Sequence, residues 1–464
     1  MKILIYFMAW SKSLSNVFKV IFPFADFLYI LQLEEYDSKR YLHWLPRFFW
    51  RRNFQRRDHV VYTQRIKSVL LVTIGLLLIV TLISWHFIGL GWIAVAAVSI
   101  IFIPAYILAA NILLSPWYRY LKHVLFARAA AKIRNQGTDL KVIAVAGSYG
   151  KTTTKNFIDQ LVRYHHRTQM IPGNINTPLG IAHWIMTKLQ PGTTLLIVEI
   201  DGHSRREMIQ SARMVTPDIA VITNIGDQHL ERFGSVLKLK EALQEIFINA
   251  KPTADLICDS ETAQQIPTLA VAGKKLQVLD INTEISYQGK SLAEIELSAS
   301  NLINLQLALA VAEILNIPHH IVSDTIQQLE LPGRRQKVSQ MLGYEAIDDS
   351  YNISSTTARA GLAQARIIAD AAHKKLLVIT AGIPELGPQN LDGNIILGKE
   401  LKSTADHIAV LGSVFAADLT TGIADETKFT QYTDYQTMAT QLHEKFDPAT
   451  WFLLVQPELG DLYY

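Results

Sequence analysis

The longest apolar stretch of the chain runs from residue 68 to residue 118 and contains no Lys, Arg, Asp or Glu. A single helix of that length would extend about 75 Å at about 1.5 Å per residue, whereas the hydrocarbon core of a bilayer is about 30 Å thick. The pattern therefore predicts two transmembrane helices, near 68–87 and 92–114, joined by a turn at 86–91. A buried helix pair in the core of a soluble domain is the alternative.

Basic residues flank this stretch on both sides, while the turn between the two predicted helices has no Lys, Arg, Asp or Glu. The basic residues are Arg47, Arg51, Arg52, Arg56, Arg57, Arg65 and Lys67 before it and Arg119, Lys122, Arg128, Lys132 and Arg134 after it. Because cytoplasmic loops carry an excess of Lys and Arg, both flanks are expected in the cytoplasm. We interpret residues 1–137 as a multi-pass region of the cell membrane, with the rest of the chain in the cytoplasm.

The beginning of the chain allows two interpretations. Residues 16–33 are apolar but contain Lys19, Pro23 and Asp26, so they could form a third span or a helix that lies in the membrane interface. We favour the span, which places the N-terminus outside. Residues 41–57 are rich in aromatic side chains and Arg, a composition typical of an interfacial belt on anionic lipid and equally compatible with a solvated basic loop.

Beyond residue 138 the pattern changes, because short apolar runs now alternate with segments of helical periodicity. This alternation predicts mostly parallel sheets with helices on both faces. The runs expected as strands are 142–146, 194–198, 219–222, 375–380, 407–411 and 451–455. We therefore expect two α/β domains, one at 138–331 and a smaller one at 332–464.

Composition adds limits on the partners and on the compartment. The 464 residues are 49% hydrophobic and 18% charged, which is consistent with a protein that is partly embedded in a membrane. A net charge of +3 is too small to indicate a nucleic-acid partner. Cys258 is the only cysteine of the sequence, which excludes an internal disulfide framework and a Cys-rich zinc site.

The first apolar run of the α/β region ends in GSYGKT at residues 147–152, and a helix-forming run follows. Glycines in such a loop let successive backbone N–H groups point at phosphate oxygens, and the helix N-terminus adds partial positive charge. Lys151 can supply a charge for the β- and γ-phosphates, and the Thr152 hydroxyl can bind Mg²⁺. The strict motif requires glycine at position 145, where this chain has Val145, so the loop is a variant form.

Two later strand-like runs end near groups that can bind a metal ion. Glu199 closes the run at 194–198, and His229 follows the run at 219–222. Because the carboxyl ends of parallel strands meet at one edge of the sheet, both side chains are expected beside the phosphate loop. A structural histidine remains the alternative for His229.

Six segments occur in the order typical of Mur ligases, the ATP-dependent amide ligases of peptidoglycan precursor synthesis. They are GSYGKTTTK, the strand end IVE, PDIAVITNIGDQHLERFGS, SASNLINLQLALAVAEIL, LPGRRQ and DDSYN. The resemblance covers residues 138–420 and is greatest to the branch that adds D-alanyl-D-alanine to the UDP-muramoyl tripeptide. It identifies 138–331 as the P-loop-type central ATP-binding domain and 332–464 as the C-terminal domain. The predicted membrane region stands where the family has its UDP-binding domain.

The resemblance implies functions for individual residues, with ATP and Mg²⁺ as cofactors. The expected metal ligands are Thr152, Glu199 and His229. The expected nucleotide-binding residues are Gly147, Ser148, Gly150, Lys151, Thr152, Thr153, Asn301, Asn304, Arg334 and Asn352. The expected catalytic residues are Lys151, His229, Arg334 and Asp349. The family histidine that precedes the first asparagine is Ser300 here, and the loop 173–178 resembles the one that lies near the substrate.

Three departures from the family pattern concern the substrate and the metal. Where the family reads D-S-Y-N-A-N-P-x-S, residues 353–357 read ISSTT, and VQPELGD at 455–461 stands in place of a K-G-S segment. The lysine that family members carbamylate to hold a second magnesium falls on Leu243. Lys238 and Lys240 lie in other helical positions, so we expect no carbamylated lysine and a weakened or lost second magnesium site.

Together these features predict a membrane-anchored ATP-dependent ligase that joins an amino acid or dipeptide to a peptidoglycan precursor through an acyl phosphate. Its partners would be the precursor, the membrane and other wall-synthesis enzymes, with no nucleic acid. One alternative is a membrane scaffold that binds nucleotide without ligating. Another is a related amide ligase, such as a polyglutamate-type ligase or one that acts on a lipid-linked precursor.

Overall fold

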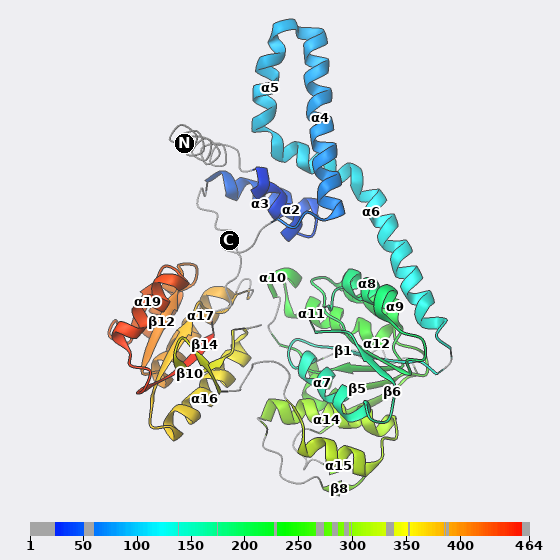
Figure 1. The fold of residues 1–464 in the computed structure, drawn as a ribbon, viewed down its shortest axis with the longest axis vertical. Coiled ribbons are helices and arrows are strands. Elements are labelled where there is room, and N and C mark those ends of the chain that lie inside the picture. Colours follow the sequence, from blue (N-terminus) through cyan, green and yellow to red (C-terminus); the bar gives the residue numbers. More distant parts are fainter. Residues whose placement is uncertain are drawn as a thin grey trace, which may run out of the picture. The chain divides into compact units, whose positions relative to one another are not determined.

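The computed structural model describes residues 24–50, 60–137, 139–173, 175–226, 230–265, 273–280, 286–291, 297, 299–330, 338–350, 353–384, 386 and 389–456. The chain divides into two compact units, one that reaches Val124 and one that begins at Leu125. The three β-sheets of the described residues, two with six strands and one with two, belong to the second unit (Figure 1). The predicted boundaries at residues 137 and 331 stay predictions.

The first unit is helical. Its elements are α2 (Phe24–Leu33), α3 (Ser38–Trp50), α4 (Gln64–Ile88), the 3₁₀ turn η1 (Gly89–Gly91), α5 (Trp92–Ile101) and α6 (Ile103–Arg134). Side chains from four of these helices, among them Leu28, Tyr41, Ile66 and Ile107, form one apolar cluster. The buried Asn111 joins the segments around it, since its Nδ2 donates to the Tyr36 carbonyl (2.9 Å) and its Oδ1 accepts from Arg65 (3.1 Å).

Helices α4 and α5 form the two arms of a hairpin around η1 (Figure 1). By length and apolar composition, one stretch of the described chain, Gln64–Ile101, could cross a membrane. The first predicted span, 68–87, lies within α4. The second, 92–114, was wrong as a single helix, because the chain breaks at Phe102 between α5 and α6. Pro104 explains the break, since its ring lacks an N–H and clashes with the carbonyl four residues earlier.

The predicted third span, 16–33, is described only from residue 24 onward. Helix α2 has 10 residues and is therefore about 15 Å long, half the thickness of a bilayer core. Its side chains at Phe27, Leu28 and Ile30 are buried in the cluster of the first unit. The described part of this segment is thus a packed helix and does not span a membrane by itself.

The first sheet carries the phosphate loop. Its strands are β1 (Lys141–Ala146), β2 (Thr168–Met170), β3 (Leu195–Glu199), β4 (Ile219–Ile222), β5 (Asp255–Asp259) and β6 (Lys275–Leu279). They pair in parallel in the order β2-β3-β1-β4-β5-β6. From β1 the chain crosses to the edge strand β2 and returns to β3 beside β1, and it then continues on the other side of β1 through β4, β5 and β6, so β1 lies at the point where the direction reverses. Ligands bind at this point in open parallel sheets.

Helices cover both faces of this sheet (Figure 1). Alternate residues of β1 point to opposite faces: Ile143 and Val145 pack in the apolar cluster with α7 (Lys151–Val162) and α14 (Ala299–Ile314), whereas Val142 and Ala144 belong to the cluster on the other face. The helices are α7 (Lys151–Val162), α8 (Pro178–Lys188), α9 (Arg205–Val215), α10 (Leu230–Phe233), α11 (Val236–Leu243), α12 (Glu245–Ile248), α13 (Ser260–Gln265), α14 (Ala299–Ile314) and α15 (His319–Gln327). A small hairpin, β7 (Ser286–Tyr287) and β8 (Lys290–Ser291), precedes α14.

The last turns of α6 are part of this first α/β domain. Ala129 and Ile133 are buried in its core. Lys132 donates to the carbonyls of Ile185 (2.8 Å) and Met186 (3.0 Å) near the end of α8. The helix that leaves the apolar hairpin therefore ends as a structural element of the first α/β domain.

The second sheet confirms the smaller α/β domain. Its strands are β9 (Val338–Met341), β10 (Tyr344–Asp348), β11 (Lys375–Thr380), β12 (His407–Leu411), β13 (Phe429–Tyr432) and β14 (Trp451–Gln456). The order is β13-β12-β11-β14-β10-β9, and all pairs are parallel except β9 with β10. Its helices are α16 (Ser355–Ala371), α17 (Asn390–Thr404), α18 (Ala416–Ile423) and α19 (Tyr435–Lys445).

Candidate active site

The loop between β1 and α7 has the geometry of a phosphate-binding loop. Gly147 and Gly150 have φ values of 145° and 76°, which favour glycine. The segment after β4 holds the loop in place, because Asn224 accepts from the Ser148 N–H through its carbonyl (2.8 Å) and from the Tyr149 N–H through Oδ1 (3.2 Å). The Ser148 hydroxyl in turn accepts from the Gly226 N–H (2.9 Å). The backbone of this loop is therefore fixed before any ligand binds.

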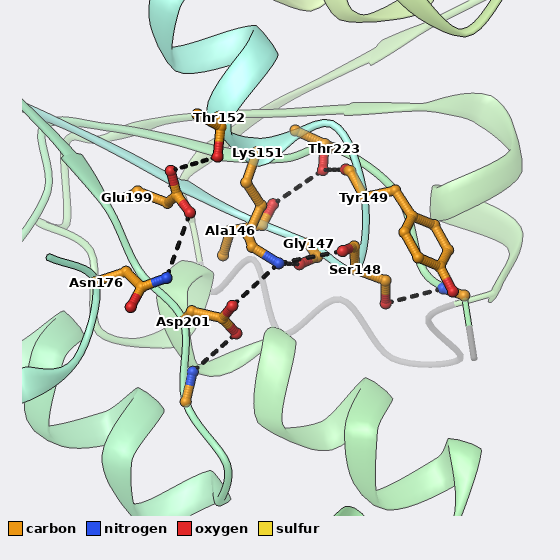
Figure 2. A network of polar contacts seen from close by, with 12 residues as sticks. Ala146, Gly147, Ser148, Tyr149, Lys151, Thr152, Asn176, Glu199, Asp201 and Thr223 are labelled. Atoms are coloured by element: carbon orange, nitrogen blue, oxygen red, sulfur yellow. Dashed lines mark hydrogen bonds and ion pairs between the residues drawn. The ribbon is translucent and has the colours of Figure 1, made fainter. Parts of the chain in front are cut away.

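Lys151 points back over this loop (Figure 2). Its Nζ donates to the carbonyls of Gly147 (2.7 Å) and Ser148 (3.1 Å), and it lies 3.2 Å from Oδ2 of Asp201. The side chain is buried. The charge predicted for the phosphates is thus present at the loop, with a carboxylate beside it.

Thr152 and Glu199 face each other across the gap between α7 and β3 (Figure 2). The Thr152 hydroxyl donates to Oε2 of Glu199 (3.0 Å). Asn176 donates to the other oxygen, Oε1, at 3.5 Å. The carboxylate at the end of β3 therefore lies beside the phosphate loop, as the order of the strands predicted.

A second lysine completes this arrangement. Lys155 is fully buried, and its Nζ lies 3.1 Å from Oε2 of Glu199 and donates to the Ile171 carbonyl (2.9 Å). Burial lowers the pKa of the Lys155 ammonium, and the negative charge of Glu199 opposes this shift. The predictions did not include this residue, although it lies one helical turn after Lys151.

Helix α14 closes the opposite side of the loop. The Thr154 hydroxyl donates to Oδ1 of Asn304 (3.2 Å), and Asn301 and Asn304 are both buried. A Cβ added at Gly150 would lie 2.2 Å from the same Oδ1. Asn304 therefore lies against the start of α7, as expected of a nucleotide-side residue.

Comparison with known proteins agrees with this geometry. Residues 145–319 match the model of the Mur ligase middle domain. Residues 145–319 are thus identified as a Mur ligase middle domain. The match includes the phosphate loop, β3 and α14, which are the elements that carry the site.

Individual relatives show how far the likeness extends. The chain is 27% identical to the UDP-N-acetylmuramoyl-tripeptide–D-alanyl-D-alanine ligase of Bacillus subtilis over 271 residues, which are 54% of this chain and 58% of that enzyme. MurF from Acinetobacter baumannii matches 73% of this chain and 77% of its own at a TM-score of 0.62 and 23% identity. MurF ligase from Thermotoga maritima in complex with ADP matches 74% of this chain and 81% of its own, with a TM-score of 0.61 and 20% sequence identity. The chain thus spans little more than half of the B. subtilis relative, and the solved structures establish the fold.

The expected site residues divide into three groups. The structure brings Lys151, Thr152, Glu199 and Asn304 together around the loop, with Gly147, Ser148, Gly150, Thr153 and Asn301 on the same elements. Asp349 lies in the C-terminal domain and is considered there. His229, Arg334 and Asn352 lie outside the described residues, so their expected functions stay predictions.

Asp349 follows β10 and is buried. Gln456, at the end of β14, donates to its Oδ2 (3.2 Å) and to the Ala358 carbonyl (3.0 Å). Gln456 lies in the segment 455–461, which stands in place of the family's K-G-S segment. An uncharged amide therefore contacts Asp349 at this position.

Residues 353–357 depart from the family pattern, but they still form the start of a helix. Ser354 is the N-cap of α16, and its hydroxyl accepts from the Thr357 N–H (3.1 Å) while Thr357 accepts from the Ser354 N–H (2.9 Å). On the family pattern these residues replace an Asn at the N-cap and a Ser at the third helical position. Asn and Ser cap helices about equally well, so the local structure is retained.

Leu243 is buried in the core of the first α/β domain, whereas Lys238 is exposed and Lys240 is half-buried. A side chain in that apolar core cannot reach a cation. The predicted weakening of the second magnesium site stays a prediction. Because the position is buried, a Leu243→Lys variant would also be expected to destabilise the fold.

The described residues fit one divalent cation at the phosphate loop. Among them, no group of three or more His, Cys, Asp or Glu side chains converges as a metal site. The Thr152 hydroxyl and the Glu199 carboxylate nevertheless supply adjacent oxygen ligands at a helix start. Mg²⁺ prefers one or two such protein ligands together with phosphate oxygens, so this pair suits it.

Proposed function

We propose that this protein is a membrane-anchored ATP-dependent ligase that forms an amide bond on a peptidoglycan precursor. The observation that carries the proposal is the position of Lys151, Thr152 and Glu199 at the switch point of the first sheet, inside the matched middle domain. The D-alanyl-D-alanine-adding relative supports a precursor peptide as acceptor and an amino acid or dipeptide as amine.

In the first step an oxygen of the acceptor carboxylate attacks the γ-phosphorus of ATP. The bond between that phosphorus and the β–γ bridging oxygen breaks, and ADP leaves. Negative charge spreads over the γ-phosphoryl oxygens in the transition state. Lys151 and the N–H groups at the start of α7 are positioned to stabilise this charge electrostatically.

Thr152 and Glu199 would hold a magnesium ion, which supplies neutralising charge for the phosphates when it is bound. His229 would add a ligand from the segment after β4. Asn301, Asn304 and Asn352 would contact the nucleotide, and Arg334 and Asp349 would act from the hinge and the C-terminal domain.

In the second step the amine nitrogen attacks the carbonyl carbon of the acyl phosphate. The carbon–oxygen bond to the phosphate breaks, the nitrogen loses a proton, and inorganic phosphate leaves. This step requires that water be kept from the acyl phosphate. A second α/β domain that closes over the phosphate loop would supply that protection.

The membrane assignment rests on the hairpin of α4 and α5, whose exposed side chains from Leu71 to Ile101 are mostly apolar, and on its basic flanks. We propose that the hairpin lies in the cell membrane and that both α/β domains lie in the cytoplasm, where ATP is available. Anchoring raises the effective concentration toward substrates held at the same surface. This higher concentration would favour ligation of a lipid-linked precursor, or assembly with other wall-synthesis enzymes.

The departures from the family pattern at residues 353–357 and 455–461 favour two alternatives, a scaffold that binds nucleotide without ligating and a ligase for another acceptor. Phosphate release by the full chain in detergent distinguishes them, measured with ATP, Mg²⁺, an amine and either a UDP-linked or a lipid-linked muramoyl peptide. We expect acceptor-dependent release that Lys151→Ala abolishes and Lys188→Ala, at an exposed lysine of α8, leaves intact. Unchanged release by Lys151→Ala would overturn the assignment, and ATP binding without release would favour the scaffold.

A further inference from the structure

Lys155 has contacts that the proposed reaction does not use directly. Its ammonium lies 3.1 Å from Oε2 of Glu199, the oxygen that also accepts from the Thr152 hydroxyl. Its remaining contact is with the carbonyl of Ile171, which precedes the loop 173–176. Lys155 is fully buried, so its ammonium contacts Glu199 from within the protein.

Gly173 and Asn176 both lie against this group of side chains. A Cβ at Gly173 would be 3.1 Å from Cγ2 of Thr152, 3.5 Å from Nζ of Lys155 and 3.7 Å from Oε2 of Glu199. From the same loop, Asn176 reaches Oε1 of Glu199 at 3.5 Å. The Lys155 ammonium therefore fixes two things at once, one oxygen of Glu199 and the backbone that leads into the loop.

Stability alone does not account for a buried pair of this kind. Removing two charges from water costs several kcal/mol per ion, and well-packed apolar side chains of similar volume often replace buried pairs without loss. A buried lysine beside a carboxylate that can bind a metal has a functional explanation. It holds that carboxylate in one rotamer, so that the ligand geometry exists before the cation arrives.

We infer that Lys155 is a positioning residue that orients Glu199 for the divalent cation of the ATP site. This inference rests on the proposed function, because it takes Glu199 as a ligand of the cation. It assigns to Lys155 no contact with ATP, with either substrate or with the cation itself. In this assignment Lys151 stabilises the charge of the phosphates, whereas Lys155, one turn further along α7, orients the carboxylate of Glu199.

The test measures binding of Mn²⁺ to the full chain in detergent by electron paramagnetic resonance, with and without a non-hydrolysable ATP analogue. Lys155→Met keeps most of the side-chain volume and removes the charge. We expect it to weaken binding of Mn²⁺ in the presence of the analogue at least tenfold. Metal-free binding of the analogue should change no more than about twofold. Lys188→Met, at an exposed lysine, is the matched control and should bind as the wild type.

A double-mutant cycle separates positioning from a merely structural effect. If Lys155 acts through Glu199, adding Lys155→Met to Glu199→Gln should cause no further loss of Mn²⁺ affinity. Full Mn²⁺ affinity of a folded Lys155→Met protein, or additive losses in the double variant, would overturn the inference. Lys155→Arg keeps the charge and should retain more Mn²⁺ affinity than Lys155→Met, which provides a comparison if the latter folds poorly. Unchanged Mn²⁺ affinity of Glu199→Gln would instead overturn the metal site of the proposed function.

Discussion

Oδ2 of Asp201 lies 3.2 Å from Nζ of Lys151, so the lysine of the phosphate loop is paired with a carboxylate of its own domain. Asp201 follows Glu199 by two residues and is about one-fifth exposed, while Lys151 is buried. The same domain thus pairs Lys151 with Asp201 and Lys155 with Glu199. An incoming γ-phosphate would compete with Asp201 for the charge of Lys151.

Neutralising this carboxylate should strengthen nucleotide binding. In Asp201→Asn the competing negative charge is lost, and an interaction worth about 1 kcal/mol corresponds to an affinity about fivefold higher. Titration with a fluorescent ATP analogue in the absence of substrates measures this. Weaker binding would instead mean that Asp201 is needed to hold Lys151 in place.

Gly150 and Gly234 offer a matched pair for testing the loop, because their φ values are 76° and 77°. A Cβ at Gly150 would lie 2.2 Å from Oδ1 of Asn304, whereas at Gly234 it would meet no atom within 4 Å. Gly234→Ala should therefore cost about 1 kcal/mol from backbone strain alone. Gly150→Ala should lose about 1–3 kcal/mol more and should impair nucleotide binding. Equal denaturation midpoints and equal nucleotide affinities would contradict this account of the loop.

The hairpin tip allows a test of the membrane topology. Leu90 in η1 is 85% exposed. Cys258 is buried, and burial raises the pKa of its thiol to about 12, so the natural cysteine should react poorly with maleimides. If the hairpin crosses the membrane, Leu90→Cys should be labelled by an impermeant maleimide added outside intact cells. Tyr120→Cys, beyond the hairpin, should be labelled only after permeabilisation. The reverse pattern would contradict the proposed orientation.

The stability of the C-terminal domain should depend on Asp406 in acid. Burial by itself raises the pKa of this carboxyl, but hydrogen bonds from the Leu376 N–H (2.7 Å) and the Arg366 guanidinium (2.8 Å) outweigh burial and hold the pKa below its usual range. A carboxyl with a lowered folded pKa stabilises the fold above its unfolded pKa of about 3.9. That stabilisation is lost as the pH falls through the folded value.

Asp406→Asn should accordingly lower the free energy of unfolding by no more than about 1 kcal/mol at pH 7, since solvent screens this partly exposed pair. Below about pH 3 the difference between variant and wild type should shrink. Urea denaturation of the full chain in detergent at both pH values measures this difference in the free energy of unfolding, with Glu444→Gln at an exposed site as control. A difference that does not depend on pH would contradict this interpretation of Asp406.

Strong local signals made much of the fold predictable. The apolar runs at 142–146, 219–222 and 375–380 are strands of parallel sheets, because buried parallel strands are continuously apolar. The position of Glu199 followed from the rule that strand ends meet at one edge of the sheet. Such patterns act over a few residues and can be recognised without tertiary information.

Other features depended on contacts that the sequence does not reveal. Lys155 lies one turn after Lys151, but only the approach of β3 makes it the partner of Glu199. The break at Phe102 was missed because the apolar composition continues through Pro104. The residues after 353 differ from the family pattern, yet Ser354 and Thr357 form a capping box that starts α16.

The central claim, ligation through an acyl phosphate, is tested most directly by following one oxygen atom. The acceptor is labelled with ¹⁸O in both carboxylate oxygens and incubated with the full chain, ATP, Mg²⁺ and the amine. Mass spectrometry then measures the inorganic phosphate. Because the amine displaces the carboxylate oxygen together with the phosphate, we predict one ¹⁸O in each phosphate released and none when Lys151→Ala replaces the wild type. Phosphate without ¹⁸O, which indicates hydrolysis by water, or no phosphate at all would contradict the account.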